Sequence, residues 1–123
     1  MSPKKKLLIV DDELNLRTLY QEVFTDAGYE VALASCGPEA VKMVEQDKPD
    51  LVILDIRMPG MNGLDVMGEI LSRDNQLPII INSAYGHYKE NFMSWSADAY
   101  VEKSPDYNEL KDKVAEVLAK RGG

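Results

Sequence analysis

Five short apolar runs alternate along this chain with amphipathic stretches, and this alternation limits the folds open to it. Runs of three or four residues bounded by polar or turn residues are typical of strands. The run at 51–54 is apolar on both faces, as the central strand of a parallel sheet requires. The runs lie at 7–10, 31–34, 51–54, 78–81 and 99–101. Strands that alternate with helices predict a doubly wound α/β fold, with helices on both faces of a parallel sheet.

Apolar residues three and four positions apart predict helices between these strands. The first helix should end at Gly28, and the second should begin at Gly37-Pro38. The last should begin after Asp106, which has the spacing of a capping box with Glu109. A third helix is expected between the second and the last. The apolar positions of the four helices, in chain order, are Leu16, Leu19, Tyr20, Val23, Phe24 and Ala27; Ala40, Val41 and Val44; Leu64, Met67, Ile70 and Leu71; and Leu110, Val114, Val117 and Leu118.

The stretch before the fifth run carries a weaker helical pattern. Tyr88, Phe92 and Trp95 fall four and three positions apart, but Gly86 and many polar residues lie around them. Two interpretations stay open for these aromatic residues: they pack against the core, or they form a partly exposed docking stripe. Turn residues at 58–60 and 62–63 follow the third run.

Composition narrows the class of protein. The chain has 123 residues, of which 45% are hydrophobic and 28% charged, and this predicts one globular domain over residues 1–123. A single cysteine, Cys36, fits a reducing compartment, and no apolar run approaches the roughly 20 residues that span a bilayer. We therefore expect a cytoplasmic domain without membrane insertion. The net charge of −7 argues against direct binding of nucleic acid.

Polar side chains stand where the predicted strands end. Asp11 and Asp12 follow the first run, Asp55 follows the third, Ser83 follows the fourth and Lys103 follows the fifth. In open α/β sheets, ligands bind beyond the carboxyl ends of the strands. We therefore expect these five residues to lie around one cleft.

The three aspartates predict a cation in that cleft. Carboxylates about 4 Å apart repel by roughly 4 kcal/mol per pair at an effective dielectric near 20, so they need a compensating charge. An all-oxygen site with open positions suits Mg²⁺ or Mn²⁺. A divalent ion, Lys103 and Asp55 together would form a phosphoryl acceptor site. Asp11 and Asp12 also have a simpler interpretation, as acids favoured at a helix N-terminus.

Four motifs carry a resemblance to a known family. They are Leu8-Ile9-Val10-Asp11-Asp12-Glu13, the stretch 51–63 from Leu51-Val52-Ile53-Leu54-Asp55 to Asn62-Gly63, Asn82-Ser83-Ala84-Tyr85-Gly86, and Ala97-Asp98-Ala99-Tyr100-Val101-Glu102-Lys103. Over essentially its whole length, the chain resembles the receiver domain of two-component response regulators. The resemblance implies a (βα)5 flavodoxin-like fold with strand order 2-1-3-4-5.

The resemblance also implies a role for each matching acid. Asp55 matches the phosphoacceptor, which takes a phosphoryl group from a phosphohistidine. Asp12 and Asp55 match direct ligands of Mg²⁺, and Asp11 matches a ligand that acts through water. The backbone carbonyl of Arg57 matches the remaining protein ligand.

The same resemblance implies how phosphorylation is sensed. Lys103 and Ser83 match the groups that bind the phosphoryl oxygens, together with the backbone amides of Arg57 and Ala84. Tyr100 matches an aromatic switch that turns inward when Ser83 moves. Negative charge added at one point would then bias a two-state element.

The implied partners are a sensor histidine kinase or a histidine phosphotransfer protein, and a downstream protein bound at the face of the fourth helix, fifth strand and last helix. A dimer formed on phosphorylation is compatible with this family. The domain would be a signalling protein rather than an enzyme. The alternatives are the receiver half of a longer transcription factor or enzyme, an aspartyl-phosphate phosphotransferase or phosphatase, and a flavin-binding electron carrier.

Three departures from the family pattern stand out. Ser104 follows Lys103 where the family usually has proline, so this peptide bond is expected to be trans. The segment from Ser83 to Lys103 is about two residues shorter than usual. Arg57 and Tyr85 flank the site, and their bulk predicts slow self-dephosphorylation of Asp55.

Overall fold

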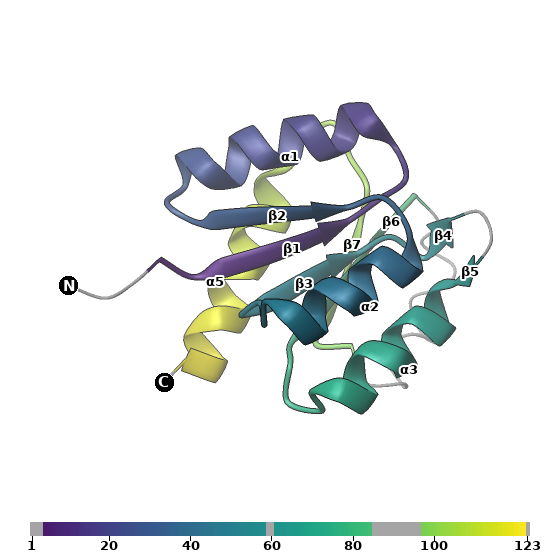
Figure 1. Cartoon of the computed structure of the whole chain (residues 1–123). Helices are drawn as coiled ribbons and strands as arrows, with labels where there is room; N and C mark the ends of the chain where they lie inside the picture. Colours follow the sequence, from purple (N-terminus) through teal and green to yellow (C-terminus); the bar gives the residue numbers. More distant parts are fainter. Residues whose placement is uncertain (1–3, 59–60, 85–96, 123) are drawn as a thin grey trace.

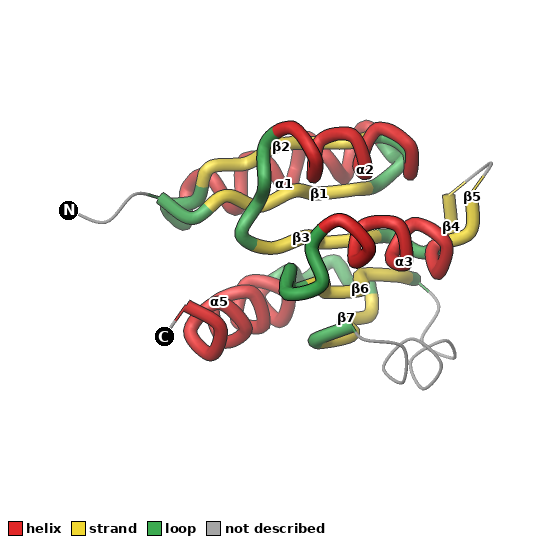
Figure 2. The backbone as a smooth tube through the Cα atoms, turned by 60° about the horizontal axis from the view of Figure 1, so that its bottom comes forward, coloured by secondary structure: helices red, strands yellow, loops and turns green. Residues whose placement is uncertain are grey.

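A five-stranded parallel sheet forms the centre of the computed structural model, which describes residues 4–58, 61–84 and 97–122. Its strands are β1 (Lys6–Val10), β2 (Glu30–Ala34), β3 (Leu51–Leu54), β6 (Ile79–Ser83) and β7 (Ala99–Glu102). They pair in the order β2-β1-β3-β6-β7, as Figure 2 shows from top to bottom. Numbered within this sheet alone, the order is 2-1-3-4-5, which confirms the expected fold.

Helices cover both faces of the sheet (Figure 1). Helices α1 (Leu14–Asp26) and α5 (Asn108–Gly122) pack on one face, and helices α2 (Gly37–Gln46) and α3 (Gly63–Arg73) pack on the other. Strand β3 sends Val52 and Leu54 to the α2–α3 face and Leu51 and Ile53 to the α1–α5 face. All four side chains are buried, as predicted for a central strand.

Helix α1 ends as the sequence predicts. Gly28 has φ of 100°, a left-handed conformation that glycine adopts without steric strain. Its N–H donates to the Thr25 carbonyl at 3.0 Å, and the Tyr29 N–H donates to the Phe24 carbonyl at 3.0 Å. These two bonds form a Schellman motif. The expected apolar face was partly wrong, because Leu19 and Ala27 are exposed.

The capping box expected at the last helix does not form. Asp106 Oδ1 accepts the N–H of Asn108 at 2.9 Å, while the Asp106 N–H donates to Ser104 Oγ at 3.1 Å rather than to Glu109. The first helical bond joins the Lys111 N–H to the Tyr107 carbonyl, so the helix begins later than the spacing suggested. The expected aromatic stripe of Tyr88, Phe92 and Trp95 lies outside the described residues.

The turn predicted after the third strand lies within a small hairpin. Strands β4 (Arg57–Met58) and β5 (Met61–Asn62) pair antiparallel and project beyond the end of the main sheet (Figure 2). Gly63 follows them at the start of α3. A Cβ atom on Gly63 would lie 2.6 Å from Ile56 Cα, so this position requires glycine for close approach of two backbones.

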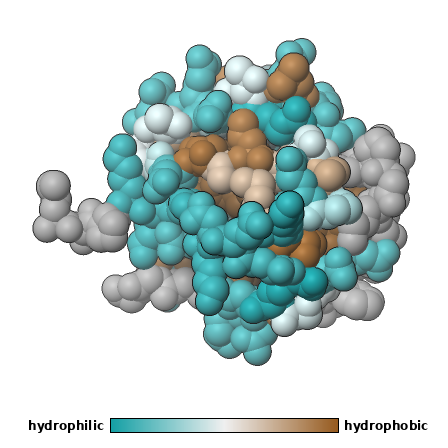
Figure 3. Space-filling model, viewed as in Figure 1, coloured by the Kyte–Doolittle hydropathy of each residue, from teal (hydrophilic) through white to brown (hydrophobic). Residues whose placement is uncertain are grey.

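Strand β2 forms one edge of the sheet and is only partly covered. Its residues Val31, Ala32 and Leu33 are half-buried, and Figure 3 shows hydrophobic residues gathered where β2 runs between α1 and α2. Within the described ranges, no helix has the length and apolar character needed to cross a membrane.

Candidate functional site

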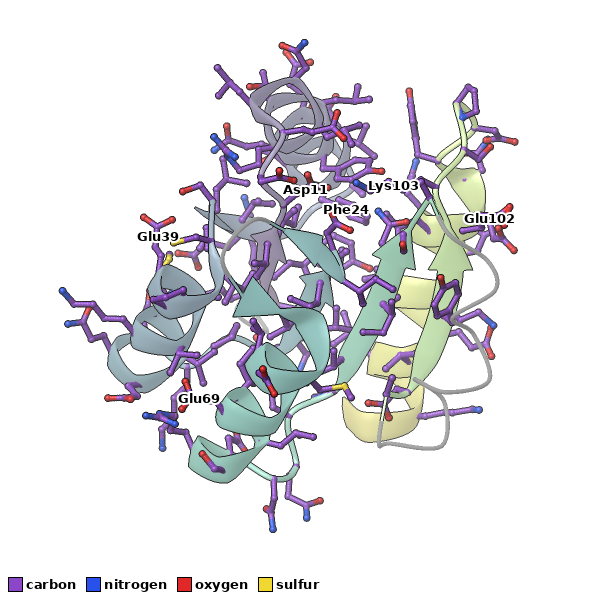
Figure 4. The ribbon with its side chains drawn as sticks, turned by 90° about the vertical axis from the view of Figure 1, so that its right-hand side faces the viewer. Asp11, Phe24, Glu39, Glu69, Glu102 and Lys103 are labelled. Atoms are coloured by element: carbon purple, nitrogen blue, oxygen red, sulfur yellow. The ribbon has the colours of Figure 1, made fainter. Side chains whose placement is uncertain are left out.

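The polar residues named from the sequence lie at the carboxyl ends of the parallel strands. Asp11 follows β1, Asp55 follows β3 and Lys103 follows β7. In Figure 4, the side chains of Asp11 and Lys103 converge there, whereas Glu102 points away from them. Ser83 is the last residue of β6 rather than the residue after it, so the fourth strand extends further than the sequence suggested.

Lys103 joins two buried carboxylates. Its Nζ lies 2.8 Å from Asp11 Oδ2 and 3.2 Å from Asp55 Oδ2, and Glu13 Oε1 lies 3.9 Å away. Asp11 is only 2% exposed and Asp55 only 5% exposed. Buried carboxylates are costly unless a cation or hydrogen bonds compensate them, and Lys103 provides that charge.

The charge of Lys103 is maintained by its surroundings. Burial lowers the pKa of the ammonium group, but the hydrogen bond and charge of Asp11, followed by those of Asp55, outweigh this effect. The pKa of Lys103 is therefore raised above its ordinary value. The side chain stays protonated at neutral pH and attracts negatively charged groups to this end of the sheet.

The backbone holds the two buried aspartates in place. The Asp55 N–H donates to the Val10 carbonyl at 2.9 Å, which continues the ladder between β1 and β3. Asp11 Oδ1 accepts the N–H of Glu13 at 2.9 Å, and Arg17 Nη1 on α1 donates to the Asp11 carbonyl at 2.7 Å. The side chain and the backbone carbonyl of Asp11 are thus both hydrogen-bonded to residues at the start of α1.

Asp12 completes a cluster that could hold a metal ion. Asp11, Asp12 and Asp55 can each offer one carboxylate oxygen within 4.8 Å of the others. Asp12 is exposed, so the cluster faces solvent on that side. Three hard oxygen donors with one open side fit Mg²⁺ or Mn²⁺ rather than a softer metal. Arg57, the expected carbonyl ligand, lies two residues after Asp55 in strand β4.

The two residues expected to act as a switch lie on neighbouring strands. Ser83 pairs with Glu102 in the register of β6 and β7, and Ile81 pairs with Tyr100. Ser83 is fully buried, and Tyr100 is buried in the core on the α2–α3 face. The Lys103 N–H donates to the Ser83 carbonyl at 2.7 Å, so the backbones carrying the lysine and the serine are directly joined.

The structure tests one of the expected departures from the family pattern, the trans peptide bond after Lys103. The Lys103–Ser104 peptide bond is trans, like every peptide bond in the described residues. Ala84 is exposed next to Ser83. Tyr85 lies outside the described residues, so shielding by Arg57 and Tyr85 remains a prediction.

Sequence reasoning missed several polar contacts beside the site. No role was assigned to Arg17 or Glu13, and the buried hydrogen bond in which Asn82 Nδ2 donates to Tyr20 Oη at 3.1 Å was not predicted. Asn82 did leave a signal, since it is a polar residue directly after Ile79-Ile80-Ile81 in a buried strand. Its partner on α1 could not be identified from spacing alone.

Comparison with known proteins agrees with this geometry. The family model for the response regulator receiver domain matches residues 7–115. This chain therefore belongs to the response regulator receiver domain family. The chain is therefore a receiver domain of a phosphorelay.

Individual relatives differ in length. Sporulation initiation phosphotransferase F of Bacillus subtilis is 34% identical over 116 residues, which cover 93% of this chain and 94% of the relative. The probable transcriptional regulator ycf27 of Guillardia theta is 38% identical over 120 residues, but this chain spans only 47% of its length.

Solved structures show the same fold. The response regulator TrrA of Thermotoga maritima, in complex with Mg²⁺ and BeF, is 47% identical, with a TM-score of 0.87 over 93% of this chain and 99% of TrrA. TrrA has also been solved in complex with the histidine kinase ThkA, and that copy has a TM-score of 0.85.

Proposed function

We infer that Asp55 is the phosphoacceptor of this receiver domain. The observation that carries this inference is the position of Lys103 Nζ between the buried carboxylates of Asp11 and Asp55. A carboxylate beside a fixed ammonium group and an acidic metal cluster can attack phosphorus while the developing charge is neutralised. The acylphosphate would then carry its new negative charge next to Lys103.

Asp11, Asp12 and Asp55 would hold Mg²⁺, with the backbone carbonyl of Arg57 as a further ligand. When bound, the ion would neutralise charge on the transferred phosphoryl group. In the structure, Asp11 Oδ2 already contacts Lys103 and Asp11 Oδ1 accepts a backbone N–H. This supports a role for Asp11 through water, with Asp12 and Asp55 as direct ligands.

Ser83, Lys103 and the backbone amides of Ala84 and Arg57 would bind the phosphoryl oxygens. Ser83 and Lys103 are linked through their backbones, so movement of one affects the other. Tyr100, which lies near the end of the neighbouring strand β7, would report the change. A charge-assisted bond contributes roughly 1.5–3 kcal/mol, so a few of them can shift a two-state equilibrium.

The partners follow from the same reading. We propose a sensor histidine kinase or phosphotransfer protein as donor, as the TrrA–ThkA complex suggests by analogy. A downstream protein would bind the expected face of the fourth helix, the fifth strand (β7) and the last helix (α5), and phosphorylation would promote a dimer there. The expected fourth helix lies outside the described residues. The domain would occupy residues 1–123 in the cytoplasm, would not bind nucleic acid itself, and would catalyse only its own phosphorylation and dephosphorylation.

Phosphorylation by a small donor tests this function. The protein is incubated with acetyl phosphate and Mg²⁺, and intact-mass spectrometry counts the phosphoryl groups added. Wild type should gain one group, and Asp55→Asn should gain none. Asp112→Asn, which changes an exposed aspartate on α5, is the matched control and should label like wild type. Equal labelling of Asp55→Asn would overturn the assignment, and loss of labelling without Mg²⁺ is expected.

A further inference from the structure

A buried hydrogen bond connects helix α1 to the strand that ends at the site. Asn82 Nδ2 on β6 donates to Tyr20 Oη on α1 at 3.1 Å, and the two residues are 2% and 4% exposed. Leu7, Ile9, Ile53 and Ile80, all apolar, form the surrounding core on this face of the sheet. A polar pair at this position therefore needs an explanation beyond packing.

Stability alone does not account for the pair. A neutral hydrogen bond contributes little net stability, and replacing both partners by apolar groups of similar shape is often nearly neutral. Leaving one partner unpaired is what destabilises. An apolar pair would thus serve the core about as well as Tyr20 and Asn82 do.

One end of the pair is directly joined to the phosphoryl-binding groups. Asn82 precedes Ser83, and the Ser83 carbonyl accepts the Lys103 N–H at 2.7 Å. The Lys103 ammonium in turn contacts Asp11 and Asp55. A shift of the strand at Asn82 therefore moves both the serine and the lysine backbones.

The other end of the pair returns to the acidic cluster. Tyr20 lies one helical turn after Arg17 on α1, and Arg17 Nη1 donates to the Asp11 carbonyl at 2.7 Å. The contacts thus form a closed ring through α1, Asp11, Lys103, Ser83 and Asn82. Burial raises the pKa of the Tyr20 phenol, so the hydroxyl stays protonated at neutral pH and can accept the Asn82 amide.

We propose that Tyr20 and Asn82 are positioning residues, whose hydrogen bond holds Ser83 and Lys103 at the right distance from the acidic cluster for binding a phosphoryl group. This role rests on the proposed function of Asp55. Ser83 and Lys103 would bind the phosphoryl group more weakly if they were displaced even slightly. Loss of the Tyr20–Asn82 bond should therefore weaken phosphoryl binding more than metal binding. The hydrogen bonds between Asp11 and Glu13 and between Arg17 and Asp11 involve neither Tyr20 nor Asn82, so we expect the variants to retain them.

Four variants test the proposal. Tyr20→Phe removes only the hydroxyl and retains the ring, which packs edge-on against Phe24. Asn82→Leu replaces the amide with an apolar group of similar size, and the double variant replaces both partners. Tyr29→Phe is the matched control, because Tyr29 also packs against Phe24 but lies beyond the far end of α1.

Two affinities are measured for each variant. The first is that for Mg²⁺ alone, by calorimetry, and the second is that for beryllofluoride in saturating Mg²⁺, by fluorine NMR. Tyr20→Phe, Asn82→Leu and the double variant should each bind beryllofluoride about fivefold more weakly, the effect of one neutral hydrogen bond. Their Mg²⁺ affinity should stay within about twofold of wild type, and Tyr29→Phe should change neither.

The double variant separates positioning from folding. Its resistance to urea should recover relative to Tyr20→Phe, while its beryllofluoride affinity stays low. Unchanged beryllofluoride affinity in Tyr20→Phe would overturn the proposal, as would an equal loss of Mg²⁺ affinity, which indicates general loosening. Tyr20→Phe alone is decisive should Asn82→Leu not fold. Failure of the wild type to bind beryllofluoride would instead refute the function proposed for Asp55.

Discussion

Substitution of Lys103 by methionine should destabilise the metal-free protein. The Lys103 Nζ lies 2.8 Å from Asp11 and 3.2 Å from Asp55, and methionine retains the apolar stem while removing the charge. At an effective dielectric of about 20, these contacts attract by about 6 and about 5 kcal/mol before desolvation. Removing one partner of a buried pair typically lowers the free energy of unfolding by about 3–5 kcal/mol. We expect about 3 kcal/mol, because the exposed Asp12 leaves the cluster open to water on one side.

Urea unfolding in EDTA and in Mg²⁺ measures this effect. Mg²⁺ should stabilise Lys103→Met more than wild type, because the ion no longer competes with an ammonium group for the same carboxylates. Lys6→Met is the control. Lys6 Nζ lies 2.6 Å from Asp47 Oδ2, but the Asp47 side chain is 65% exposed. Removing this exposed ion pair should therefore lower the free energy of unfolding far less.

The reasoning is refuted if Lys103→Met and Lys6→Met lose the same stability in EDTA. That result would mean that solvent or protonation, rather than Lys103, compensates Asp11 and Asp55. An equal Mg²⁺ effect in wild type and Lys103→Met would separately refute competition between the ion and the lysine.

Two further predictions concern the surroundings of the site. Gly63→Ala should lower the free energy of unfolding by about 1–3 kcal/mol, because its Cβ would lie 2.6 Å from Ile56 Cα. Gly68→Ala in the same helix has open space and should raise it by about 0.5–1 kcal/mol; urea unfolding of both variants checks this, and similar behaviour of the two would contradict it. Burial raises the pKa of Tyr20, so its contribution to stability is complete below about pH 10, the unfolded value, and is lost as pH rises through the folded pKa. Tyr20→Phe should therefore lose less stability than wild type between about pH 9 and pH 11; parallel losses in urea unfolding would count against this.

The sequence was sufficient to predict the fold and the grouping of the acids. Apolar runs such as 51–54 report burial on both faces directly, and the carboxyl ends of parallel strands meet at one edge by geometry. Asp11, Asp55 and Lys103 could therefore be brought together before any contact was known. Local signals at helix ends were less reliable. Gly28 ended α1 as predicted, whereas Asp106 did not form a capping box because Ser104 Oγ accepts its N–H.

The sequence pattern by itself determined which residues stand at the strand ends, because the position of a strand end depends only on the short-range periodicity of the chain. The tertiary structure decided which of these residues touch. Only packing of α1 on the sheet could place Tyr20 against Asn82, 62 positions apart, and only the approach of two backbones explains Gly63. Such contacts depend on distances between elements, and no local pattern encodes those distances. The cluster at Asp55 was thus predicted by the sequence, while the lysine contacts and the polar ring that hold it came from the folded protein.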